Sequence, residues 1–106
     1  SNFTKICENS FSYCVNLKKV EISTNSNLQT IENFAFLLSN IKEIFIPSSL
    51  TKICEYAFYD CNEFLIIEIS EGSKLHSIPK SAFESCPKLI IMIPKSLKSI
   101  QTINST

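Results

Sequence analysis

The sequence predicts a repeat solenoid, of α/β type or mainly β, with one short parallel strand per repeat and short helical or 3₁₀ turns. Three observations lead to this prediction. A pattern of apolar residues recurs along the whole chain, every complete copy holds a phenylalanine at the same place, and no copy has enough apolar residues to bury a core by itself. Neighbouring copies must therefore stack on one another to exclude water.

The copies, called units below, begin at residues 3, 28, 50, 75 and 97, so their lengths alternate between 25 and 22 residues. In each complete unit the phenylalanine lies eight residues after the start: Phe11, Phe36, Phe58 and Phe83. We expect these rings to form one row along the coil. The chain is then a single domain, residues 1–106, with repeats at 3–27, 28–49, 50–74, 75–96 and a partial one at 97–106.

Each unit opens with a short apolar pair, as in Leu50 and Ile53, which predicts a second extended segment on another side of the coil. The following stretch, residues 55–60 in the third unit, predicts one helical or 3₁₀ turn whose alanine and phenylalanine point inward. The unit ends in a strand rich in β-branched residues. Pro47 and Pro94 follow two of these strands and should end them, because proline cannot donate a ladder hydrogen bond.

The longer units carry additional polar residues in one connector, at positions 23–27 and 70–74. Insertions in solenoids collect at one loop position on one face, which fits this arrangement.

The third unit shows the pattern most completely, through Leu50, Ile53, Ala57, Phe58, Cys61, Phe64, Ile67 and Ile69. It resembles the BspA-type leucine-rich repeat, which reads roughly L-x-x-I-x-x-x-A-F-x-x-C-x-x-L-x-x-V-x-I-P. The resemblance covers the whole chain and implies a right-handed leucine-rich-repeat coil. The chain departs from the pattern in three places. Ser10 replaces the alanine, the second unit is one residue short at Leu38-Ser39 and lacks the cysteine, and the fourth is one residue short between Leu89 and Ile93.

Composition excludes several classes of function. Ten basic and ten acidic residues leave no net charge, whereas binding to nucleic acid depends on clustered Lys and Arg. No apolar run reaches the roughly 20 residues of a membrane span. The single glycine, Gly72, excludes the dinucleotide-binding fingerprint and the P-loop. It also predicts few tight turns with positive φ.

The five cysteines occupy two repeat positions. Cys14, Cys61 and Cys86 take the position beside the buried phenylalanine, and Cys7 and Cys54 share another. We expect the first three to fill the narrow interior as small apolar side chains. A disulfide between Cys61 and Cys86 stays open as an alternative, since these two cysteines lie in neighbouring units. The odd count and the lack of a C-x-x-C motif argue against a zinc site.

No catalytic constellation stands out. His76, the single histidine, occupies a variable repeat position and is expected on the surface. Glu8 and Glu55 recur at one repeat position, which predicts a solvated ladder rather than an acid/base pair. We therefore expect no enzyme, no metal site and no cofactor. Two glycosylation triplets, at Asn2 and Asn104, give weak support for secretion.

The outward residues of the strands are the candidate binding residues, because their side chains alternate with the inward ones. One predicted column reads Lys19, Glu43, Ile66 and Ile90, and its neighbour reads Glu21, Phe45, Glu68 and Met92. This face becomes apolar toward the C-terminal units, which is typical of protein contact surfaces. Two alternatives stay open: a longer chain covers the face, or a slipped register buries Ile90 or Met92.

The sequence thus predicts a non-catalytic protein-interaction module that binds no nucleic acid. The resemblance implies a surface or extracellular, adhesin-like role toward a protein ligand such as a host or matrix protein, with a cytoplasmic location left open. The alternative is a structural spacer that presents another domain. The abrupt first unit and the truncated fifth unit indicate a fragment of a longer array.

Overall fold

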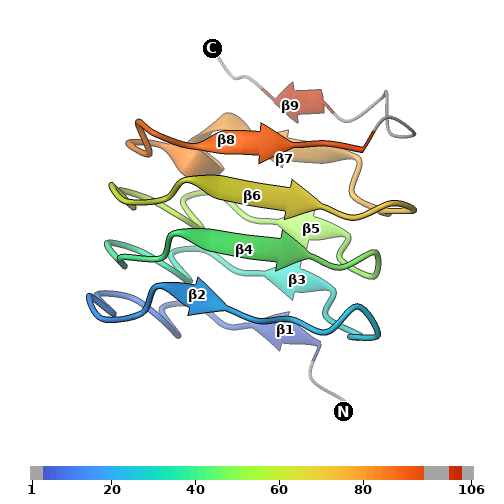
Figure 1. Cartoon of the computed structure of the whole chain (residues 1–106), viewed down its shortest axis with the longest axis horizontal. Coiled ribbons are helices and arrows are strands. Elements are labelled where there is room, and N and C mark those ends of the chain that lie inside the picture. Colours follow the sequence, from blue (N-terminus) through green and yellow to red (C-terminus); the bar gives the residue numbers. More distant parts are fainter. Residues whose placement is uncertain (1–3, 95–100, 104–106) are drawn as a thin grey trace.

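A computed structural model of the chain shows a right-handed coil, in which the front strands run in one direction and the back strands return (Figure 1). The structure describes residues 4–94 in full, together with the backbone of strand β9 at 101–103. Both predicted sequons, at Asn2 and Asn104, lie outside the described residues. The predicted parallel-strand solenoid is confirmed.

The front sheet contains one strand from each complete unit. Its order is β2 (Lys19–Val20), β4 (Glu43–Ile46), β6 (Ile66–Ile69) and β8 (Ile90–Met92), and all neighbours are parallel. Burial alternates along β4 and β6, because every second side chain points into the coil. Pro47 directly follows β4, as expected of a residue that cannot continue the ladder.

The back sheet is built from the apolar pairs that open the first three units. It consists of β1 (Lys5–Ile6), β3 (Thr30–Ile31) and β5 (Lys52–Ile53), again parallel. The expected second extended segment is therefore a strand, and a complete unit contributes two strands rather than one.

The partial fifth unit pairs with the fourth. Strand β7 (Ser77–Pro79) pairs with β9 (Gln101–Ile103), and Ile78 lies beside Thr102. In the repeat alignment the residue equivalent to Ile78 is Ile100, two residues before Thr102. A shift of two residues leaves the two faces of a strand unchanged, because side chains alternate with a period of two. Register at this end is therefore less strictly specified by the apolar pattern.

The turns correct two expectations. Only the fourth unit has a 3₁₀ helix, η1 (Lys80–Phe83), among the described residues. The other units carry left-handed residues at fixed places, two before or two after the repeat phenylalanine. In the first three units these residues are Asn9, Tyr13, Phe34, Leu38, Tyr56 and Asp60. The fourth unit has one such residue, Ser85, and none of the seven is a glycine. A chain with one glycine thus builds many positive-φ turns.

Hydrogen bonds between units explain these turns. The Phe36 amide donates to the Ala57 carbonyl at 2.8 Å, and the Leu38 amide donates to the Tyr59 carbonyl at 2.9 Å. In a helix both amides would donate within their own segment. Here they bind the next unit instead, so stacking compensates the strain of the left-handed backbone.

The phenylalanine row forms the centre of the core, as predicted. Ring centroids are 5.1 Å apart for Phe11 and Phe36, 4.9 Å for Phe36 and Phe58, and 5.4 Å for Phe58 and Phe83. Phe36 and Phe58 are inaccessible to solvent, whereas the two end rings are partly exposed. Each unit therefore buries its ring against its neighbours, which is the physical basis of a solenoid.

Candidate functional site

The outer surface of the front sheet carries the predicted binding residues. We call it the strand face; it comprises Lys19, Glu21, Glu43, Phe45, Ile66, Glu68, Ile90 and Met92. Strand pairing aligns Lys19, Glu43, Ile66 and Ile90 in one column. It aligns Phe45, Glu68 and Met92 in the next. The two columns thus have the predicted register except at Glu21, which follows β2 and lies outside the paired residues. The binding role of all eight residues stays a prediction.

Polarity changes along this face. At its N-terminal end, Lys19 and Glu21 form an ion pair of 3.7 Å between highly exposed side chains, which adds little stability because water screens it. At the other end Ile90 is 62% exposed and Met92 is 49% exposed. The alternative in which a slipped register buries these two residues is therefore wrong.

Two further large apolar residues next to the front strands are exposed. Leu65, just before β6, is 42% exposed, and Ile93, just after β8, is 44% exposed. The repeat pattern assigns Ile93 an inward place, as for Ile46 and Ile69, and that expectation is wrong. Strand β8 ends at Met92, and no described strand of the front sheet stacks beyond β8 to cover Ile93.

Phe45 lies between two hollows of the strand face. One, of about 600 Å³, is lined by Lys19, Glu21, Glu43, Phe45, Ile66 and Glu68, among others. The other, of about 400 Å³, is lined by Phe45, Glu68 and Met92 together with neighbours toward Pro94. A half-buried aromatic ring between hollows, rimmed by carboxylates, has the character of an anchor for a partner side chain.

The cysteines serve packing in this structure, which holds all five as free thiols. The Cys61 sulfur donates to the Phe36 carbonyl and the Cys86 sulfur to the Phe58 carbonyl, each at 3.0 Å. The alternative of a disulfide between these two cysteines is not adopted, because each thiol is engaged with the turn of the preceding unit. The neighbouring Cys61 thiol and, after it, burial raise the pKa of the Cys86 thiol.

The second unit fills the cysteine position with Ser39, which is buried, and its hydroxyl lies 3.8 Å from the Cys61 sulfur. The missing cysteine is thus replaced by another small side chain. The sequence pattern contains this signal, because Ser39 lies three residues after its phenylalanine, as the cysteines do.

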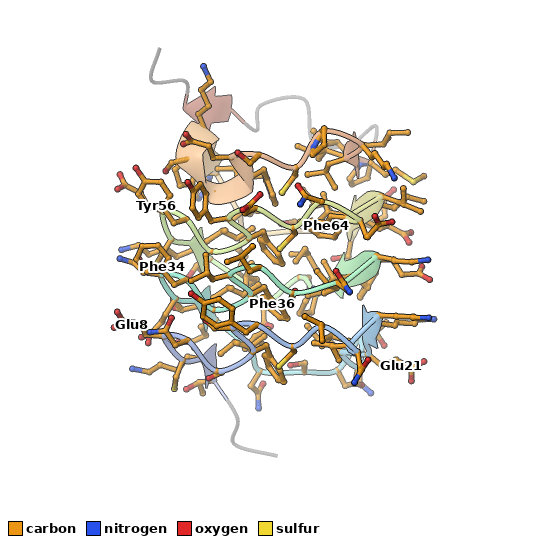
Figure 2. All side chains as sticks on the ribbon, turned by 90° about the vertical axis from the view of Figure 1, so that its left-hand side faces the viewer. Glu8, Glu21, Phe34, Phe36, Tyr56 and Phe64 are labelled. Atoms are coloured by element: carbon orange, nitrogen blue, oxygen red, sulfur yellow. The ribbon has the colours of Figure 1, made fainter. Side chains whose placement is uncertain are left out.

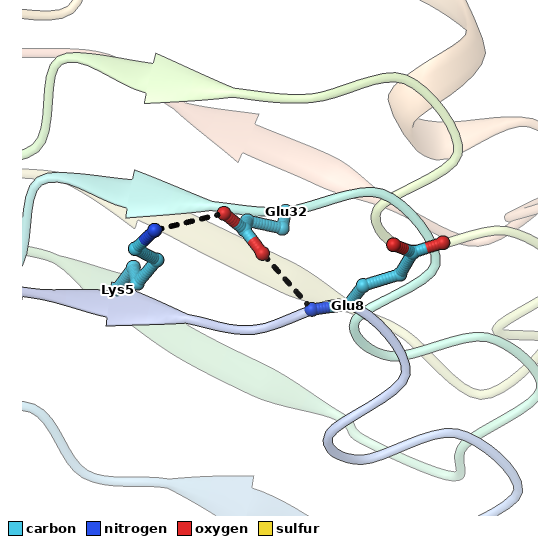
Figure 3. A network of polar contacts seen from close by, with 3 residues as sticks. All are labelled: Lys5, Glu8 and Glu32. Atoms are coloured by element: carbon cyan, nitrogen blue, oxygen red, sulfur yellow. Dashed lines mark hydrogen bonds and ion pairs between the residues drawn. The ribbon is translucent and has the colours of Figure 1, made fainter.

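Acidic residues on the back of the coil have a structural role. The Glu32 carboxylate forms an ion pair of 3.5 Å with Lys5 and accepts a hydrogen bond of 3.2 Å from the Glu8 amide (Figure 3). This network joins the first two units. The carboxylates of Glu8 and Glu55 are exposed, as expected, and so is His76.

In the described part of the chain, no group of three or more His, Cys, Asp and Glu side chains could hold a metal ion. In the same part, no helix has the length and apolarity needed to cross a membrane.

Comparison with known proteins adds one finding. The sequence profile of a family described as the BspA type leucine-rich repeat region (6 copies) matches residues 1–104. No curated protein and no solved structure matches the chain.

Proposed function

The chain belongs to the BspA-type leucine-rich repeat family, and we propose that it binds a protein ligand through its strand face without catalysing a reaction. Membership of this family indicates a protein-interaction repeat module, and such repeats are generally non-catalytic. Fold membership cannot name the ligand, so the proposal depends on the surface itself.

The observation that carries the proposal is the apolar cluster formed by Phe45, Ile66, Ile90 and Met92. Ile66 pairs with Ile90 in one column, and Phe45 and Met92 flank Glu68 in the next. Ile90 and Met92 are among the most exposed large apolar side chains described. Soluble proteins seldom leave contiguous apolar surface open without a use for it. Burying this cluster against a partner would supply the hydrophobic centre of an interface.

The rim of the face indicates the chemistry of the ligand. Glu43 and Glu68 are exposed beside Phe45, while the cation Lys19 is already paired with Glu21. A ligand that offers an apolar side chain to the centre and basic side chains to the rim would match this charge.

The proposal extends to location. BspA-type repeats are often found on the cell surface. We therefore place the module at the cell surface or outside the cell, in an adhesin-like role toward a host or matrix protein.

The test compares retention of surface and matrix proteins by the wild-type chain and by the double variant Phe45→Ser/Ile66→Ser. The matched control is Tyr13→Ser/Val15→Ser, which removes two exposed apolar side chains outside the strand face. Any retained ligand is then purified and titrated. We expect binding to be lost in the strand-face variant and kept in the control.

A second variant guards against loss of folding, because Phe45 is partly buried. Glu43→Lys/Glu68→Lys reverses two exposed charges and should leave circular dichroism and thermal unfolding unchanged. It should weaken binding of a basic ligand. If the strand-face variants bind the same ligand as the wild type does, the proposal is wrong and the spacer alternative is favoured.

A further inference from the structure

A hollow larger than either of those on the strand face lies along the turns of the third and fourth units. Its volume is about 1050 Å³, and its lining includes Tyr56, Asp60 and Glu84. Neither the repeat pattern nor the proposed interaction uses this edge of the coil.

An aromatic column ends at this hollow. The repeat position two residues before the buried phenylalanine holds Asn9, Phe34, Tyr56 and Ser81 in successive units. Phe34 and Tyr56 stack with centroids 5.5 Å apart and planes 5° from parallel, and Figure 2 shows them one above the other. Ser81 is too small to continue the stack, and the 3₁₀ helix of its unit replaces the left-handed turn. The Tyr56 ring therefore lines the hollow instead of meeting a third ring.

The ring is held in place from two sides. Phe34 packs on it face to face, and Tyr59 meets it edge to face with centroids 5.5 Å apart and planes 83° apart. A ring fixed in this way offers a preorganised surface, so a ligand loses little side-chain entropy of the protein on binding.

Charge selects the kind of ligand. The carboxylates of Glu55, Asp60 and Glu84 line the hollow, against the single ammonium group of Lys80. None of the three carboxylates forms an ion pair with a described residue. An aromatic face surrounded by unneutralised carboxylates attracts a cation, through the ring quadrupole and through the negative potential.

We propose that this hollow binds an arginine side chain of a basic peptide segment, with the guanidinium plane stacked on Tyr56 and its N–H groups donating to Asp60 or Glu84. Arginine suits the site better than lysine, because its planar group can stack on a ring and donate to a carboxylate at the same time. The site is formed by the turn edge, so it is independent of the strand face and of the proposed function.

The experiment titrates the chain with the peptide acetyl-Gly-Arg-Gly-Arg-Gly-amide at low salt, followed by nuclear magnetic resonance and calorimetry. Tyr56→Asn removes the ring but keeps the left-handed backbone, which Asn9 adopts at the same repeat position. We expect the dissociation constant to rise about fivefold. The control Tyr13→Asn makes the same change at another left-handed position outside the hollow and should bind like the wild type.

Further experiments test the contribution of the carboxylates to peptide binding. Asp60→Asn and Glu84→Gln should each weaken binding, and added salt should weaken it further.

Three results would overturn the proposal. These are equal binding by Tyr56→Asn and wild type, equal binding of the peptide in which uncharged citrulline replaces arginine, and tighter binding of a neutral oligosaccharide. The last result would assign the hollow to a sugar instead.

Discussion

Replacing Phe58 with alanine tests whether the phenylalanine row stabilises the coil. Phe58 is inaccessible to solvent and contacts three rings, with centroid distances of 4.9 Å to Phe36, 5.0 Å to Phe64 and 5.4 Å to Phe83. No other ring in the described structure makes more ring contacts. Its removal therefore affects two interfaces between units at once.

The magnitude follows from these contacts. Burial of a phenylalanine contributes about 1.5–3 kcal/mol, and a ring pair adds about 0.5–1.5 kcal/mol. Because the neighbouring units relax only partly around the cavity, we expect Phe58→Ala to lower the free energy of unfolding by about 3–5 kcal/mol. A domain of this size has a total of only about 5–15 kcal/mol, so the variant is close to unfolding.

Phe11→Ala is the matched comparison, because it removes the same side chain from the end of the row. Phe11 is partly exposed and stacks on Phe36 alone, with centroids 5.1 Å apart. We expect a loss of about 1–2 kcal/mol from this smaller burial and the single ring pair. Urea unfolding followed by circular dichroism measures both free energies.

A third variant keeps the test informative if Phe58→Ala does not fold. Phe58→Leu retains most of the volume and loses the ring contacts, so its expected loss is about 1–1.5 kcal/mol. The reasoning is refuted if Phe11→Ala is at least as destabilising as Phe58→Ala, since position in the row would then not determine the loss.

Three other predictions concern the turns and the thiols. Tyr13→Asn should raise the free energy of unfolding by about 0.5–1 kcal/mol in thermal melts, because asparagine tolerates the left-handed backbone better and Tyr13 is 64% exposed. Cys61→Ser should be about 0.5–1.5 kcal/mol more stable than Cys61→Ala in urea, since serine keeps the donor to the Phe36 carbonyl. Burial raises the pKa of the Cys54 thiol, so a smaller fraction of it is thiolate at pH 8. Mass spectrometry should therefore show slower alkylation by iodoacetamide at Cys54 than at exposed Cys7. The alkylation rate at Cys54 should still rise at higher pH.

Much of the fold follows from the sequence because the repeat is regular. Equivalent positions of stacked units become neighbours, so the spacing of Phe36 and Phe58 predicts their stacking without further information. The alignment of Glu43, Ile66 and Ile90 on the strand face follows in the same way. The one-residue deletions did not disturb this register, since they lie in the connecting segments before the strands.

Other features could not be predicted from the repeat. Ile93 matches an inward position in the pattern, but its exposure depends on what stacks beyond β8. The network around Glu32 depends on how closely the stacking of two units brings its carboxylate to Lys5 and to the Glu8 amide, and no motif in the sequence marks it.

The sequence by itself determined most of the residues that face the interior and which units lie side by side, because a regular repeat places like residues next to one another. The tertiary structure alone decided the left-handed backbone conformation of the turns and which side chains of different units these turns place side by side. The left-handed conformations of Phe34 and Tyr56 conflict with local preference. They persist because amides of the turns bind carbonyls of the next unit, an interaction that no single segment contains. The same stacking places Tyr56 and Glu84, which belong to different units, around one hollow.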